Sequence, residues 1–61
     1  MIFDNIKKYA DEKGWSIARV EREAKIANGT IRKWEKGSPR VAFLQKVADA
    51  LGVPIEKLLK E

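Results

Sequence analysis

Basic side chains are the residues of this sequence best suited to chemistry, and they gather between positions 15 and 40. Seven of them stand there against three glutamates: Arg19, Arg22, Lys25, Arg32, Lys33, Lys36 and Arg40 against Glu21, Glu23 and Glu35. A run of lysine and arginine on a small helix is usually only a solvated face. In this chain, however, the charges crowd around one turn that holds Asn28, Gly29 and Thr30. The crowding favours a nucleic-acid-binding surface over a solvated face.

Catalysis and metal binding lack the residues that they need. The chain has no cysteine and no histidine, which excludes disulfides, thiol chemistry, zinc fingers and imidazole catalysis. Ser16, Thr30 and Ser38 therefore have no imidazole base, and the carboxylates are scattered among basic neighbours. We expect a protein that is not an enzyme and that has no catalytic residue, no metal ligand and no cofactor.

Length and charge set the scale of the molecule. The 61 residues predict a single domain, residues 1–61, and a domain of this size buries only about 60% of the surface of its unfolded chain. The net charge of +4 and the pI of about 9.6 have the right sign for a polyanionic partner. No apolar run approaches the ~20 residues of a membrane span, and the N-terminus lacks a signal-peptide pattern. We expect a cytoplasmic protein with no membrane partner.

The elements that position the basic residues are predicted to be helices. An apolar stripe at helical spacing marks the first of them, and it consists of Phe3, Ile6 and Ala10. Gly14 is expected to end this helix as the glycine just past a C-cap. Ser16 is expected to cap the second helix through its hydroxyl, and Trp15 to pack on Val20 as a core residue.

The second and third helices carry the basic turn. On the outer side of the second helix, four-residue spacing predicts two exposed ion pairs, Arg19–Glu23 and Glu21–Lys25. The third helix is expected to run from near Asn28 to Lys36 and to end at Gly37. Its inward residues are Ile31 and Trp34, which meet Ile26. The outward set is Asn28, Gly29, Arg32, Lys33 and Lys36, as a recognition helix in the major groove would present it.

Two further helices are predicted to complete an all-α fold. Ser38 and Pro39 have the pattern of an N-cap and a first-turn proline for a fourth helix, which Gly52 ends. Its core stripe consists of Val41, Leu44, Val47, Ala48 and Leu51, with Phe43 at the shoulder. Pro54 then opens a short fifth helix, in which Ile55, Leu58 and Leu59 are expected to seal the core.

Individual side chains suggest how DNA would be read. Asn28 can pair with the N6 and N7 of adenine, and Lys33 or Arg32 with the O6 and N7 of guanine. Gly29 would let the backbone approach the base edges. The alternative for Asn28 is that it caps the third helix, because Ala27 is a poor N-cap.

Another set is expected to contact the phosphate backbone: Ser16 through its backbone N–H, with Thr30, Lys36 and Arg40. Arg40 is expected beside a helix N-terminus, where a cation is disfavoured. A bound phosphate would relieve that conflict.

Taken together, these residues resemble the helix-turn-helix of phage-repressor DNA-binding domains (Cro and lambda-repressor type, XRE-like). The pattern that carries the resemblance is Ser16, Val20, Ala24, Ile26, the run Asn28-Gly29-Thr30-Ile31, Trp34-Glu35, Gly37 and Pro39. The resemblance covers nearly the whole chain. It implies a compact five-helix bundle of the lambda-repressor-like type and sequence-specific binding in the major groove of double-stranded DNA. It also implies a transcriptional regulator, such as a phage or prophage-type repressor or a Cro-like protein.

This chain departs from the usual family pattern at four positions. Ile17 stands where the family usually has a glutamine that often contacts DNA. Glu21 and Lys25 replace the usual alanine and glycine of the turn, and Ala10 replaces an arginine of the first helix.

The resemblance further implies a homodimer on DNA, with its interface around the fourth and fifth helices. The alternative function is an antitoxin-type helix-turn-helix module that binds a protein partner.

Overall fold

The computed structural model describes residues 2–37 and 39–60, and the described chain is helical, with no strand. Its elements in order are α1 (Ile2–Lys13), α2 (Ile17–Ala24), the 3-10 helix η1 (Ile31–Glu35), α3 (Val41–Leu51) and α4 (Ile55–Leu59). The all-α class is therefore confirmed. Five helical segments stand near their predicted places, but the third is a short 3-10 helix where an α-helix was expected.

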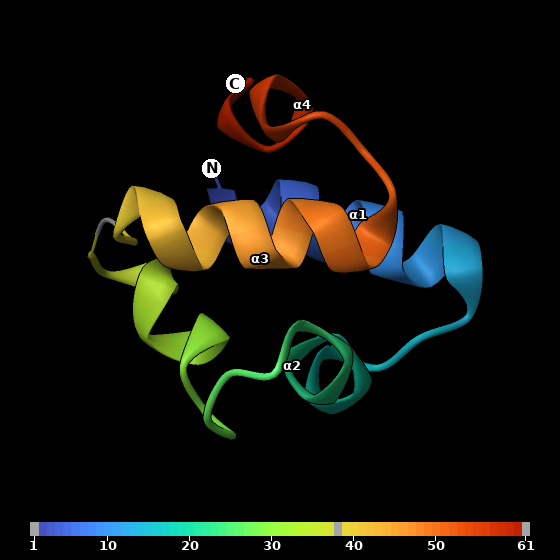
Figure 1. The fold of residues 1–61 in the computed structure, drawn as a ribbon, viewed down its shortest axis with the longest axis horizontal. Coiled ribbons are helices and arrows are strands. Elements are labelled where there is room, and N and C mark those ends of the chain that lie inside the picture. Colours follow the sequence, from blue (N-terminus) through green and yellow to red (C-terminus); the bar gives the residue numbers. More distant parts are fainter. Residues whose placement is uncertain (1, 38, 61) are drawn as a thin grey trace.

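Helix α3 is the centre of the fold. It crosses the middle of Figure 1, with α4 above it, α2 below it and α1 behind it. The fully or nearly buried apolar side chains come from all five elements: Ile6, Ala10, Val20, Ala24, Ile31, Trp34, Leu44, Val47, Ala48, Leu51 and Leu58. Because α2 and η1 both bury apolar residues against this one core, their opposite faces are left to the solvent.

Two residues expected in the core lie outside it. Val41 is 73% exposed and Leu59 is 52% exposed. Each lies on the apolar face by spacing, but Val41 is the first residue of α3 and Leu59 the last of α4, and a residue at a helix end has fewer neighbours to cover it. Phe43 is 36% exposed, as its place at the shoulder of the stripe predicted.

The predicted helix ends are confirmed where the cap is local. Gly14 follows α1 with φ of 72°, and Gly52 follows α3 with φ of 71°, a left-handed conformation that glycine adopts without steric strain. Trp15, expected in the core, is half-buried against it. One face of its ring lies 4.6 Å, measured to the centroid, from the Arg19 guanidinium.

The start of α3 differs from the prediction. The helix begins at Val41, with Arg40 as the N-cap residue in an extended conformation (φ −72°, ψ 143°). Pro39 therefore precedes the helix and is not in its first turn. The predicted cap, Ser38, lies outside the described residues.

The short helix α4 receives help from α1. The Asn5 side-chain amide donates to the backbone carbonyl of Leu58 at 2.8 Å and to that of Lys60. A five-residue helix leaves its last carbonyls without partners of its own, so this amide ties the end of α4 to α1. Within residues 2–37 and 39–60, no helix has both the length and the hydropathy to cross a bilayer.

Candidate nucleic-acid interface

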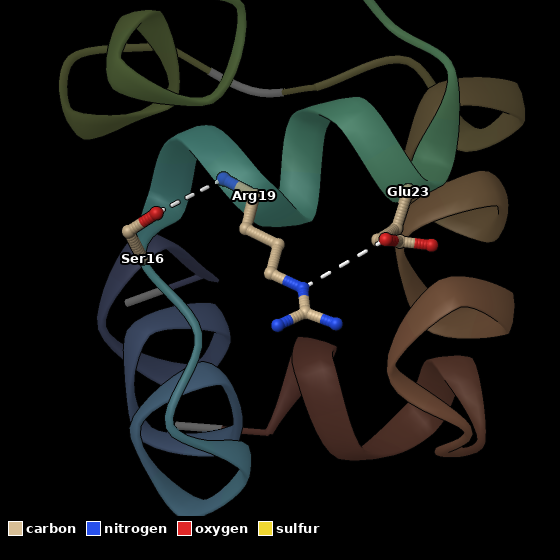
Figure 2. A network of polar contacts seen from close by, with 3 residues as sticks. All are labelled: Ser16, Arg19 and Glu23. Atoms are coloured by element: carbon tan, nitrogen blue, oxygen red, sulfur yellow. Dashed lines mark hydrogen bonds and ion pairs between the residues drawn. The ribbon is translucent and has the colours of Figure 1, made fainter.

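The first element of the candidate interface is the capped start of α2. The Ser16 hydroxyl accepts a hydrogen bond from the Arg19 backbone N–H at 3.1 Å, as predicted (Figure 2). Because the hydroxyl is committed to the cap, a phosphate contact by Ser16 would use its backbone N–H. The Arg19 side chain then reaches Glu23, with Nε 3.7 Å from Oε2, which is the first predicted ion pair (Figure 2).

The chain leaves α2 through a left-handed residue. Lys25 has φ of 61° and ψ of 41°, and no other non-glycine residue in the described part of the chain has a positive φ. Its N–H bonds to the Arg22 carbonyl at 3.1 Å, and the Ile26 N–H bonds to the Glu21 carbonyl at 3.0 Å. These are the two bonds of a Schellman-type helix end, built on lysine instead of the more usual glycine.

Glu21 overturns one prediction and adds to the candidate site a residue to which the sequence analysis had assigned no role there. It was expected on the exposed side of α2 as an ion-pair partner of Lys25, but it is only 3% exposed. Its Oε1 accepts a hydrogen bond from the Gly29 N–H at 3.0 Å, and its Oε2 accepts one from the Ile31 N–H at 2.9 Å. The signal in the sequence was a glutamate at a position where the resembled family usually has alanine.

The turn before η1 also differs from the prediction. A helix from Asn28 was expected, but residues 28–30 form a turn and η1 begins at Ile31. The reason is visible in the backbone: Gly29 has φ of 90°, which no residue of a right-handed helix adopts. The N-cap position of η1 belongs to Thr30, which makes no side-chain capping bond. The alternative role of Asn28 as the helix cap is therefore wrong.

Burial separates the two faces of η1. Ile31 is fully buried and Trp34 is 7% exposed, so both contribute to the core as predicted. Of the residues proposed to face DNA, Asn28, Arg32, Lys33, Lys36 and Arg40 are exposed, and Gly29 and Thr30 are half-buried. In residues 28–36 the exposed charged side chains are the basic Arg32, Lys33 and Lys36 and the acidic Glu35, so the exposed surface of this segment is cationic on balance. We call it the basic turn face.

A hollow lies where α2 meets this face. Its volume is about 370 Å³, and its lining residues are Ala18, Glu21, Arg22, Ile26 and Asn28. The hollow brings Asn28 and the exposed Arg22 to one depression, although Arg22 was not among the predicted site residues. Arg22 had only its charge to mark it in the sequence.

The cationic residues that follow η1 flank a helix start. Lys36 is the C-cap residue of η1 and Arg40 the N-cap residue of α3, which has no side-chain cap bond. The Arg40 side chain has no acceptor with which to cap the first N–H groups of α3, and the N-terminus of a helix attracts anions. Within residues 2–37 and 39–60, no group of three or more acidic side chains could hold a metal ion.

Three comparisons with known proteins bear on the family of this chain. The helix-turn-helix family model matches residues 6–58. Among curated proteins, the chain is similar to the HTH-type transcriptional regulators SinR of Bacillus licheniformis and of Bacillus subtilis (strain 168). Each is 34% identical over 64 aligned residues, which cover all of this chain and 58% of the relative. The chain thus spans little more than half the length of these relatives. No solved structure gave a significant match.

Proposed function

Because this chain belongs to the helix-turn-helix family of the XRE-like type, we propose that it binds double-stranded DNA sequence-specifically and acts in transcriptional regulation. The observation that carries the proposal is the basic turn face, which lies outward while Ile31 and Trp34 of the same segment are buried. The two relatives are named as transcriptional regulators, which supports this reading.

Base readout is assigned to four residues of the basic turn face. Asn28, Arg32 and Lys33 are exposed and carry donors that match adenine or guanine edges in the major groove. Gly29 has no side chain to hold its backbone away from the bases, and a Cβ built on it would meet no atom within 4 Å beyond its two chain neighbours. The side of Gly29 on which a Cβ would stand is thus open to an approaching base.

Phosphate contacts are assigned to the flanks of this face. Lys36 and Arg40 lie on either side of the loop that joins η1 to α3, and Ser16 lies at the start of α2. Thr30 joins them because its hydroxyl is not used as a cap. Such contacts fix the protein on the duplex without reading its sequence.

A homodimer on DNA is part of the proposal, since one recognition segment reads only a few base pairs. The exposed apolar residues support it: Val41 and Phe43 on α3 and Leu59 on α4 leave apolar surface uncovered. Two copies that bury this surface would read two half-sites about one helical turn apart.

The test is selection of binding sites from a random duplex pool, followed by anisotropy titration of variants on the selected and a scrambled duplex. We expect Lys33→Ala to weaken binding to the selected site by ~1–3 kcal/mol and to affect the scrambled duplex less. Arg40→Ala should weaken both duplexes alike and reduce the slope of log K against log salt by about 0.9.

Lys7→Ala is the matched control, because Lys7 is an exposed lysine on α1, a helix to which no base, phosphate or dimer contact is assigned. It should leave both affinities nearly unchanged. Equal losses on both duplexes for Lys33→Ala would contradict base readout, and an unchanged salt slope would remove Arg40 from the phosphate contacts.

A further inference from the structure

The basic turn face depends on a segment that is poorly able to hold its own shape. Helix η1 has five residues and 3-10 geometry, in which the hydrogen bonds are less favourable than in an α-helix. Its N-cap residue, Thr30, gives it no side-chain bond. A single short turn of this kind is marginal in water unless other parts of the protein support it.

Glu21 supplies that support from α2. One of its oxygens accepts the Gly29 N–H at 3.0 Å and the other accepts the Ile31 N–H at 2.9 Å. The two donors are two residues apart, so both can reach one carboxylate only when the backbone between them curls around it. The carboxylate thus constrains the backbone of residues 29–31, which lies between Asn28 and Arg32.

The charge of Glu21 makes a purely space-filling role a poor explanation. Burying a carboxylate is costly unless hydrogen bonds compensate it, and an apolar residue could fill the same volume without that cost. A carboxylate exposed at this place would also repel DNA phosphates. The hydrogen bonds of both oxygens to N–H groups of the turn compensate the cost of burial. Because the group is only 3% exposed, its repulsion of phosphates is small.

We propose that Glu21 is a positioning residue for sequence readout, which fixes the backbone of residues 29–31 before DNA binds. The inference rests on the proposed DNA binding. With the turn held, Asn28 and Arg32 meet the base edges in one geometry. Without it, the basic turn face keeps its charge, so affinity for any DNA persists while discrimination between sequences is lost.

The experiment compares Glu21→Gln with the matched control Glu23→Gln. Both variants remove one negative charge from α2, but Glu23 lies two residues along, and its side chain is 44% exposed in the pair with Arg19 (Figure 2). Glutamine at position 21 keeps one acceptor and turns an amide donor toward a backbone N–H. The ratio of affinities for the selected and the scrambled duplex should fall about tenfold in Glu21→Gln, as expected for one lost charge-assisted hydrogen bond. Glu23→Gln should keep the wild-type ratio.

Amide hydrogen exchange gives a second readout that a general loss of stability would not reproduce. In Glu21→Gln the Gly29 and Ile31 amides should exchange faster, whereas the Arg19 amide, bonded to Ser16, should be unchanged. In the wild-type protein without DNA, Gly29 and Ile31 should already be protected, and protection should change little when the selected duplex binds.

Three outcomes would overturn the inference. One is a Glu21→Gln variant that keeps the wild-type affinity ratio. Another is protection of Gly29 and Ile31 that arises only on DNA binding, a result that needs no variant and applies even if Glu21→Gln does not fold. The third is an equal fall of the ratio in Glu23→Gln, which would assign the effect to charge alone. A wild-type protein that enriches no duplex would instead overturn the proposed function and leave the exchange result standing.

Discussion

The two helix starts of the proposed DNA-binding region are satisfied in opposite ways. The start of α2 is capped by its own neighbour, since the Ser16 hydroxyl accepts the N–H of Arg19, three residues along. The start of η1 has no such neighbour: Thr30 makes no capping bond, and the N–H of Ile31 goes to Glu21, ten residues earlier in the chain. One start is secured locally, the other by tertiary structure.

The difference separates two effects of a cap: stabilising a helix and fixing its position against the rest of the fold. A local cap stabilises a helix wherever that helix lies, but it does not place the helix against another element. The Glu21 carboxylate does both, because it can accept the Gly29 and Ile31 amides only while α2 and the turn hold one relative position. The start that would meet base edges is the one whose shape depends on the rest of the fold.

The sharpest way to break this comparison is Glu21→Ala. It leaves the Gly29 and Ile31 amides without their acceptor, and the Ile31 bond is buried. We expect a loss of about 2–4 kcal/mol in the free energy of unfolding, since each lost bond to a charged group contributes roughly 1.5–3 kcal/mol and water can reach part of the site. Urea titration followed by circular dichroism measures it. If the free energy of unfolding fell by less than the loss of a local cap causes, the hydrogen bonds of Glu21 to residues 29 and 31 would contribute little to stability.

Ser16→Ala tests the local cap and should have a smaller effect. Removal of an N-cap hydroxyl typically costs about 1 kcal/mol, and here it affects one exposed bond. The same urea titration gives the value. The protection of the Gly29 and Ile31 amides against exchange should not change beyond the global loss of stability. Selective loss at those amides would show that the two starts are coupled.

The features that the sequence predicted correctly are mostly local ones. Gly14 and Gly52 end helices because a left-handed residue is needed there, and Ser16 caps α2 within one turn of chain. Each depends on residues a few positions apart, so spacing and residue type were sufficient. The buried pair Ile31 and Trp34 was also predicted, because a separation of three places both on one side of a helix.

That same separation explains why the type of η1 was missed. Three residues complete one turn of a 3-10 helix and nearly one turn of an α-helix, so Ile31 and Trp34 are compatible with both. The turn at Gly29 and the burial of Glu21 depend on how α2 packs against the segment. Four-residue spacing predicted Glu21 and Lys25 as neighbours on one side of α2, but the left-handed Lys25 lies past the end of the helix.

The smallest effect is expected for Lys25→Gly, and its sign sharpens the comparison. A left-handed backbone costs an L-residue roughly 1–2 kcal/mol, and glycine avoids this cost but loses about 0.5–1 kcal/mol through greater freedom in the unfolded chain. If Glu21 holds the turn, the greater backbone freedom of glycine at position 25 does not loosen residues 29–31 in the folded protein. The free energy of unfolding should then rise by about 0.5–1 kcal/mol, with the Gly29 and Ile31 amides protected as before. A contrary result would be a destabilised Lys25→Gly variant in which the Gly29 and Ile31 amides exchange faster. Such a variant would show that the backbone of residue 25, and not the Glu21 carboxylate, fixes the geometry of residues 29–31.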